Sequence, residues 1–268
     1  MKDFDISRRS AIQALAAGLA ATKLSAADFA FTALDHVECW VASAPASAAF
    51  YSRVFGANVL KNKQTQRRYV KLGSAYLAMD QGQAVRVDHF CAGIPNFQIA
   101  ALHEYLTARS IAYKDYPSDR DTAVTEPSGL KLQLAADHGW EQLLTGTAAA
   151  ETIAVNAPAI FEPVGIESIL LRVPDLEASI KFFGQVFGAV AISGAERWFR
   201  VGSSRIRLRQ TADGQPAAVD HLRISVRKFG ADATVQLQAA GATATRPISA
   251  NEIGFSDPDG YQIQITSV

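Results

Sequence analysis

Residues 173–189, VPDLEASIKFFGQVFGA, repeat an earlier stretch of the chain, VASAPASAAFYSRVFGA at 41–57, at a shift of 132 residues. Both stretches end in VFGA, and the dipeptide Asp88-His89 falls on Asp220-His221 at the same shift. Self-similarity that persists over such a distance indicates an internal duplication.

The repeat extends to the end of each copy, because EPSGLKLQL (126–134) falls on DPDGYQIQI (257–265) one residue closer. We therefore expect two homologous domains, at 32–140 and 163–268. The stretch between them, 141–162, contains alanines and prolines and is interpreted as a linker.

Each domain is itself a duplicate at a shift of 53 residues: LDHVECWV at 34–41 returns as VDHFCAGI at 87–94, and IESILLRV at 166–173 returns as VDHLRISV at 219–226. In each of these four opening segments the apolar residues recur with period two, which is typical of a strand. A helix is expected to follow, and short strands such as RWFRVG and SRIRLRQ end the unit. The unit is interpreted as βαβββ, present four times.

The third unit shows the expected helix most clearly. Asp175 can cap its N-terminus, and apolar residues follow at helical spacing along one face: Leu176, Ile180, Phe183 and Phe187.

The composition is that of a globular protein with a sizeable core, since 49% of the 268 residues are hydrophobic and 19% are charged. The 26 basic and 26 acidic residues cancel, so nothing indicates nucleic acid or a membrane surface as a partner. Cys39 and Cys91 are too few for a disulfide framework or a zinc motif, and alternation places them on different strand faces. Both are interpreted as small buried hydrophobes.

The N-terminus has the pattern of a targeting segment. Arg8 and Arg9 precede a short apolar stretch, too short to span a bilayer, and then small residues. The stretch resembles a twin-arginine export signal, so we expect residues 1–27 to be removed near Ala27 and the protein to reach the bacterial periplasm. The alternative is an amphipathic N-terminal helix of the fold.

The βαβββ unit, the helix end FYSRVFG (50–56) and the closing DPDGYQIQI resemble the vicinal-oxygen-chelate superfamily, which includes glyoxalase I, extradiol dioxygenases and the bleomycin- and fosfomycin-resistance proteins. The resemblance implies an α+β fold of two tandem domains with four βαβββ units in all. Paired units would curl their sheets into an open barrel around a small-molecule cavity. It implies no particular reaction, because a fold does not fix a chemistry.

Alternation assigns the faces of the strands. In the first strand Val37 and Cys39 should pack under the helix, while His36, Glu38 and Trp40 point into the cavity. Cavity-facing residues of other strands follow by the same rule: Tyr76, Ala78, His89 and Gln133.

The resemblance implies a metal bound from four such positions, which in the N-terminal domain hold His36, Ala78, His89 and Gln133. Two imidazoles and an amide leave the charge of a divalent ion uncompensated, where relatives have carboxylates. Glu38 is a nearby carboxylate that could ligate, act as a base or orient a histidine. The alternative is that the histidines only hydrogen-bond inside an inherited cavity.

The same positions in the C-terminal domain hold Ser168, Arg207, His221 and Gln264, and a permanent cation should repel a metal. Further arginines share this face, so Arg207 and His221 are candidates for binding a carboxylate or phosphate. The alternative is a solvated sheet face, or one buried against acids of the other domain. His103 and His138 are expected to be surface residues.

Two hypotheses follow. The first is an exported enzyme of the lyase, isomerase or dioxygenase type, with Fe, Zn, Mn or Ni held by His36, His89 and Gln133, Glu38 as the catalytic group, and Trp40 and Tyr76 lining the substrate cavity. The second is a metal-free protein that binds or sequesters a small, anionic molecule. The sequence leaves open whether the cavities close within one chain or in a homodimer.

Overall fold

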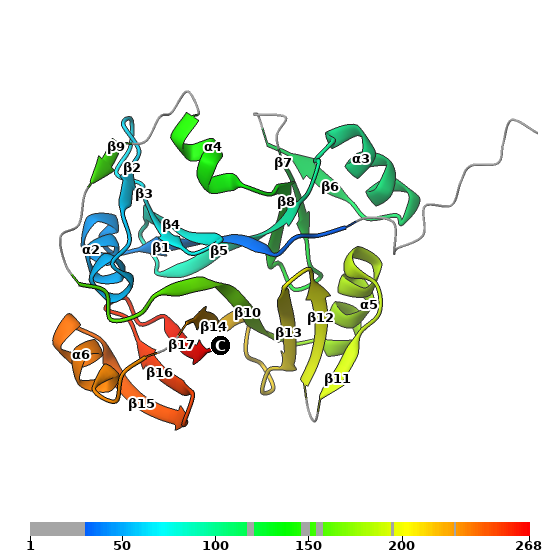
Figure 1. Ribbon diagram of the computed structural model, residues 1–268. Helices are drawn as coiled ribbons and strands as arrows, with labels where there is room; N and C mark the ends of the chain where they lie inside the picture. Colours follow the sequence, from blue (N-terminus) through cyan, green and yellow to red (C-terminus); the bar gives the residue numbers. More distant parts are fainter. Residues whose placement is uncertain (1–29, 117–120, 146–150, 154–157, 194–195, 228) are drawn as a thin grey trace, which may run out of the picture.

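The computed structural model describes residues 30–116, 121–145, 151–153, 158–193, 196–227 and 229–268. Strands dominate these residues, and five helices accompany them in a mixed α/β fold (Figure 1). No helix within the described ranges has both the length and the apolar character needed to cross a membrane.

The N-terminal half of the fold comprises ten elements: β1 (Leu34–Val41), α2 (Ala44–Phe55), β2 (Val59–Lys61), β3 (Arg68–Leu72), β4 (Ala75–Gln81), β5 (Arg86–Ile94), α3 (Ile99–Ala108), β6 (Tyr113–Asp115), β7 (Asp121–Thr125) and β8 (Lys131–Ala136). Hydrogen-bonded neighbours run in the order β2-β3-β4-β1-β5-β8-β7-β6. The two first strands, β1 and β5, are therefore antiparallel neighbours at the centre.

The C-terminal half repeats this order of elements: β10 (Pro163–Val173), α5 (Leu176–Phe187), β11 (Ala191–Ser193), β12 (Glu196–Val201), β13 (Ser204–Gln210), β14 (Ala218–Val226), α6 (Ala233–Ala240), β15 (Thr243–Ser249), β16 (Glu252–Ser256) and β17 (Gln262–Ser267). Its strands pair as β11-β12-β13-β10-β14-β17-β16-β15, with β10 and β14 antiparallel at the centre. One pair of residues, Leu34 and Ile166, joins β1 to β10.

Two further elements lie between the halves, α4 (Gly139–Thr145) and β9 (Glu151–Ile153). Both fall at or within the stretch that the sequence presents as a linker. Strand β9 extends the sheet at its β2 edge. Helix α4 lies against β4, so part of the connection belongs to the N-terminal half.

The repeated VFGA ends two helices. Helix α2 stops at Gly56, whose φ of 59° is in the left-handed region that glycine adopts without steric cost. A Cβ at Gly56 would also lie 2.6 Å from the Cβ of Ala159.

Helix α5 begins as expected, because the Asp175 carboxylate accepts a hydrogen bond of 2.9 Å from the Ala178 backbone N–H.

One apolar core is shared by the two halves, and the helices of the two halves meet in pairs (Figure 1). Helix α2 contacts α6, and α3 contacts α5, where the Tyr105 hydroxyl donates to the Val186 carbonyl at 2.7 Å. Phe183 is fully buried in this core, and the other apolar residues of the α5 stripe pack against it.

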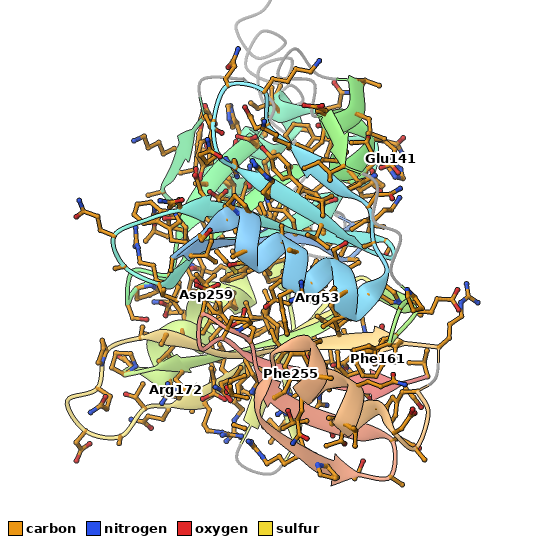
Figure 2. The ribbon with its side chains drawn as sticks, turned by 90° about the vertical axis from the view of Figure 1, so that its left-hand side faces the viewer. Arg53, Glu141, Phe161, Arg172, Phe255 and Asp259 are labelled. Carbon is orange, nitrogen blue, oxygen red and sulfur yellow. The ribbon has the colours of Figure 1, made fainter. Side chains whose placement is uncertain are left out.

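Buried carboxylates in the turns before the last strands fasten the halves together. Glu126, before β8, accepts from the Ser179 hydroxyl of α5. Asp257, before β17, accepts from the Tyr51 hydroxyl of α2 at 2.6 Å. Asp259, which lies beneath α2 in Figure 2, accepts from the Ala42 backbone N–H at 3.0 Å. Each half thus anchors a helix of the other.

Asp257 makes the stability of the protein dependent on pH. Burial raises its pKa to about 6, although hydrogen bonds from Tyr51 and from the backbone of Tyr261 oppose the shift. Between pH 4 and 7 the unfolded chain loses this proton before the folded protein does, so ionisation of Asp257 costs the fold on the order of 2 kcal/mol as the pH rises.

We expect Asp257→Asn to remove this part of the pH dependence. The free energy of unfolding, measured by urea denaturation, should fall less between pH 4 and 7 in the variant than in the parent. Asp213→Asn, at an exposed turn, is the control and should leave the profile unchanged. Identical profiles for parent and D257N would contradict the assignment.

Candidate metal centre

Every central strand carries one extra residue just before its cavity-facing position. In the pairing of β1 with β5, Leu34 faces Ala92 and His36 faces Cys91, so Asp35 is left over in a β-bulge. The other three central strands have the same irregularity at an acidic residue: Asp88, Glu167 and Asp220. A bulge re-aims side chains, and here it brings an acid to the same side as the residue that follows it.

The bulged carboxylates orient both histidines of the N-terminal half. Asp35 Oδ1 lies 2.7 Å from His36 Nδ1, and Asp88 Oδ2 lies 3.1 Å from His89 Nδ1. A carboxylate partner at Nδ1 favours the tautomer with its proton there, so each Nε2 presents a lone pair. Both imidazole side chains are buried, with 8% of their surface exposed.

The two Nε2 atoms point at one place. His36 Nε2 lies 3.4 Å from His89 Nε2 and 3.0 Å from the amide oxygen of Gln133. Glu38 Oε2 lies 3.6 Å from His89 Nε2. The Asp121 carboxylate lies near the Gln133 side chain. With the proton of each imidazole on Nδ1, acceptor atoms face one another, and a positive charge between them would satisfy all of them.

The spacing of these donors fits a divalent ion. Metal–ligand bonds of about 2.1 Å place two ligands roughly 3.0 Å apart at a right angle and roughly 3.4 Å apart at the tetrahedral angle. The observed separations of 3.0 and 3.4 Å correspond to such a set. His36, His89 and Gln133 could hold the ion through two nitrogens and one oxygen, with the Glu38 carboxylate 3.6 Å from His89 as a nearby negative charge.

The environment holds Asp88 in its charged form. The hydrogen bond from His89 lowers the pKa of Asp88 against the opposing effect of burial, and Lys131 at 3.2 Å lowers it further. In contrast, burial raises the pKa of Asp121, and the hydrogen bond from Gln133 only partly offsets this. The carboxylate behind His89 is therefore a permanent anion that would strengthen the imidazole as a ligand.

Glu38 links the centre to Arg67. The Arg67 guanidinium donates to Glu38 Oε2, and Arg67 also lies over the ring of Tyr69. Burial alone would lower the pKa of Arg67, but the charge of Glu38 together with smaller contributions from Tyr69, Asp80 and Tyr76 outweighs it, and the net shift is upward. Ala78 pairs with Glu38 in the sheet, and its small side chain leaves room above β4 for this ion pair.

Aromatic residues close the β4 side of the centre. Tyr76 stacks on His36, with ring centroids 4.6 Å apart, and Trp140 of α4 lies over Tyr76. The start of α4 is tied to the centre, because the Gly139 backbone N–H donates to Asp35 Oδ2 at 3.1 Å. Burial, followed by the charge of Asp35, raises the pKa of Tyr76, so its hydroxyl stays protonated.

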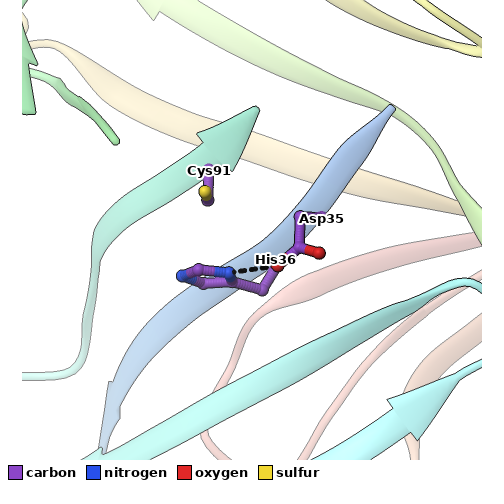
Figure 3. A group of neighbouring side chains, drawn as sticks. All are labelled: Asp35, His36 and Cys91. Carbon is purple, nitrogen blue, oxygen red and sulfur yellow. Dashed lines mark hydrogen bonds and ion pairs between the residues drawn. The ribbon is translucent and has the colours of Figure 1, made fainter. Parts of the chain in front are cut away.

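Cys91 lies beside the first of these histidines. Figure 3 shows Asp35 bonded to His36 on β1, with Cys91 on the neighbouring strand. Donor atoms of these three residues lie within 4.8 Å of one another. Burial and the charge of Asp35 raise the pKa of the Cys91 thiol, so it is a poor ligand compared with the imidazoles. Cys39 and Cys91 are both buried and unbridged, as the sequence indicates.

The remaining candidates have other partners. Trp40 lies at the end of β1, where the Arg86 guanidinium carbon lies 4.2 Å from its ring centroid. Arg207 and His221 lie together in the C-terminal half, with Nη1 3.4 Å from Nε2. Asp35 and Asp88, which orient the histidines, were missed by the sequence reasoning. The repeated Asp-His dipeptide was the available signal for both.

Comparison with known families matches residues 165–265 to the glyoxalase/bleomycin resistance protein/dioxygenase superfamily. The match is confined to the C-terminal half of the chain, which is therefore similar to a domain of this superfamily. Comparison with curated protein sequences gives no match. The matched domain is the one with Arg207, whereas the converging histidines lie in the other half of the chain.

Solved structures of glyoxalases and extradiol dioxygenases share the fold over most of the chain. The Mn(II)-bound glyoxalase of Novosphingobium aromaticivorans is 19% identical, with a TM-score of 0.63, over 89% of this chain and 83% of that one. The 2,3-dioxygenase LapB of Pseudomonas sp. KL28 is 16% identical, with a TM-score of 0.66, over 89% and 94%. Homoprotocatechuate 2,3-dioxygenase of Brevibacterium fuscum is 11% identical, with a TM-score of 0.65, over 90% and 81%. At these identities the likeness establishes the fold alone.

Asp88→Asn tests the role of the bulged carboxylate. Loss of the anion behind His89 should weaken binding of a divalent ion roughly 10- to 100-fold, measured by competition with a chromophoric chelator. Asp220→Asn changes the same dipeptide in the C-terminal half and is expected to leave the affinity unchanged. Equal effects of the two substitutions would contradict the assignment of the centre to the N-terminal half.

Proposed function

We propose that the protein is a metal-dependent, glyoxalase- or dioxygenase-like enzyme that acts on a small organic molecule at the centre in its N-terminal half. The observation that supports this most directly is the convergence of His36 Nε2, His89 Nε2 and the Gln133 amide oxygen at 3.0–3.4 Å. With both Nδ1 atoms on carboxylates, these three atoms offer only lone pairs to one another. A cation satisfies all of them at once.

In this proposal His36, His89 and Gln133 hold the ion, and Glu38 compensates its charge. A divalent metal bound there would supply a Lewis acid that polarises oxygens of the substrate. Glu38 is the group positioned to take or return a proton, because its carboxylate adjoins both His89 and Arg67. Arg67 orients it through their ion pair, and Tyr76 with Trp140 excludes water from the β4 side.

The substrate would enter from the side of β6, β7 and β8. A cavity of about 520 Å³ lies there, within the usual range for small-molecule sites. Tyr116 on its wall has its ring centroid 6.5 Å from that of His89, and Ala123 pairs with Gln133 in the sheet. Tyr113 and Lys131 also line it. The cavity suits a small, partly apolar molecule with an anionic group near Lys131.

We further propose that the chain consists of two tandem domains, 32–140 and 163–268, each built from two βαβββ units. The identical strand order in the two halves supports this division. The stretch 141–162 would then connect the domains while also supplying most of α4 and β9.

Substitution of the two histidines tests the proposed centre. Purified protein should contain about one equivalent of a divalent ion per chain, and His36→Ala and His89→Ala should each lose most of it, because three ligands hold a divalent ion far better than two. Elemental analysis gives the content. His138→Ala is the matched control, since that side chain is 76% exposed, and it should retain the ion.

The alternative function, metal-free binding of a ligand, gives a different result in the same experiment. The parent would then contain no stoichiometric ion even after incubation with Fe(II), Zn(II), Mn(II) or Ni(II) salts and desalting. That outcome would overturn the enzyme proposal. Circular dichroism of each variant shows whether a loss of metal merely reflects unfolding.

We also propose export through the twin-arginine route, followed by removal of residues 1–27. These residues lie outside the described part of the structure, and the proposal rests on the sequence of the segment. Replacing Arg8 and Arg9 by lysine should retain the precursor in the cytoplasm, because the paired guanidinium groups are read by the export machinery and not merely their charge. Cell fractionation followed by mass measurement of the exported chain tests this, and unchanged export would contradict it.

A further inference from the structure

Arginines gather on the face of the C-terminal sheet that corresponds to the metal-binding face of the N-terminal half. Arg205 and Arg223 flank Ser168 in the sheet, and Ser168 occupies the position equivalent to His36. Arg223 bonds to the Glu252 carboxylate at 2.7 Å and Arg205 to the Glu167 carboxylate at 2.8 Å. Carboxylates of the same sheet therefore compensate the charges of Arg205 and Arg223, without a contribution from the N-terminal half.

The oriented histidine of this half faces an arginine. Asp220 Oδ2 lies 2.8 Å from His221 Nδ1, as the equivalent Asp88 does for His89. His221 Nε2 then presents its lone pair to Arg207 Nη1 at 3.4 Å. Burial lowers the pKa of His221 against the hydrogen bond from Asp220, and Arg207 and Arg223 lower it further. The imidazole is thus a neutral acceptor that holds a guanidinium where its counterpart would hold a metal ion.

A cavity of about 210 Å³ adjoins this histidine. His221, Gln262 and Gln264 form part of its wall, and Arg246 reaches it across Gly254, where the absence of a side chain leaves room. The Gln264 amide oxygen accepts two hydrogen bonds from Arg223, at 3.0 and 3.2 Å, so its N–H groups are the atoms left to serve a ligand. Asp220 also lines the cavity, but Arg172 at 3.0 Å balances its charge.

Size and charge define what this cavity can hold. At about 30 Å³ for each water-sized group, it has room for roughly seven such groups. Its donors are the Arg246 guanidinium and the amide of Gln264, in the field of Arg207 and Arg223, because the Gln262 amide already donates to Ser256 and to the Gly260 carbonyl. Guanidinium groups bind carboxylates in a bidentate, charge-assisted manner.

We propose that the C-terminal half binds a small organic carboxylate, of the size of a four-carbon dicarboxylic acid, with Arg207 taking the place that a metal ion has in the N-terminal half. Arg246 and Gln264 contact the carboxylate, and Asp220 with His221 positions Arg207. This site operates without a metal and independently of the proposed enzymatic centre.

Isothermal titration of the full chain with succinate, after treatment with EDTA, tests the proposal. Arg246→Gln should weaken binding by about tenfold or more, the effect expected for loss of a charge-assisted bond. Arg207→Gln removes a nearby positive charge but no contact, so it should weaken binding by a smaller factor. Arg246 is exposed, so its replacement does not threaten the fold. Arg227→Gln is the matched control, because this arginine is 69% exposed and pairs with Glu162 away from the cavity. It should bind succinate as the parent does.

Two further titrations distinguish this site from the metal centre of the N-terminal half and identify the ligand class. The double variant His36→Ala, His89→Ala should retain succinate binding, and uncharged succinamide should not bind. Absence of binding by the parent at millimolar succinate would overturn the proposal, as would binding that survives both arginine substitutions or disappears with the histidines. Inorganic phosphate that binds more tightly than succinate would replace carboxylate with phosphate as the ligand class and overturn the assignment made above.

Discussion

The chemistry of this protein depends on a β-bulge that places a carboxylate next to the following side chain on the same side of a strand. In a regular strand Asp35 and His36 would project to opposite faces. The extra residue removes that separation, and the carboxylate can bond the imidazole at 2.7 Å. The ring is then fixed in orientation and tautomer before any ligand arrives, which is the preorganisation that a metal or anion site needs.

The two halves use this device toward different cations. In the N-terminal half two oriented imidazoles and an amide meet, and none of their three facing atoms, His36 Nε2, His89 Nε2 and Gln133 Oε1, carries a positive charge in the Nδ1-protonated tautomer. In the C-terminal half the guanidinium of Arg207 already faces His221. A resident arginine and a divalent ion exclude each other at one point, because their charges repel. The halves nevertheless depend on each other, since Glu126 and Asp257 each anchor a helix from the opposite half and one core spans both. The C-terminal half therefore contributes to the stability of the N-terminal half in addition to any ligand that it binds itself.

The sequence predicts the parts of this site that follow from periodicity. Alternation along β1, β5 and β8 places His36, His89 and Gln133 on one face, and the structure brings all three together. The same rule misplaces Asp35 and Asp88, because a bulge shifts the phase of a strand by one residue and hydrophobic patterning does not reveal it. The sequence also gives no indication that α4 would turn back over Tyr76. That contact arises because Trp140 has an apolar surface to bury, and the ring of Tyr76 on β4 provides an apolar surface against which it packs.

The absence of a carboxylate at Ala78 is the strongest chemical objection to a metal in the N-terminal half. The register of β1 and β4 meets this objection, because it places another carboxylate beside Ala78. Ala78 on β4 pairs with Glu38 on the neighbouring strand β1. The carboxylate that position 78 lacks is therefore supplied one strand away, still near the centre. From there Glu38 reaches to 3.6 Å from His89 Nε2. A larger residue at 78 would occupy the space in which Glu38 and Arg67 meet. Because Arg67 shares the charge of Glu38, the carboxylate would neutralise an ion less completely than an unpaired one, and it would retain an oxygen on which to accept a proton. The alanine is thus part of an arrangement in which one carboxylate can serve both as a counter-charge and as a base.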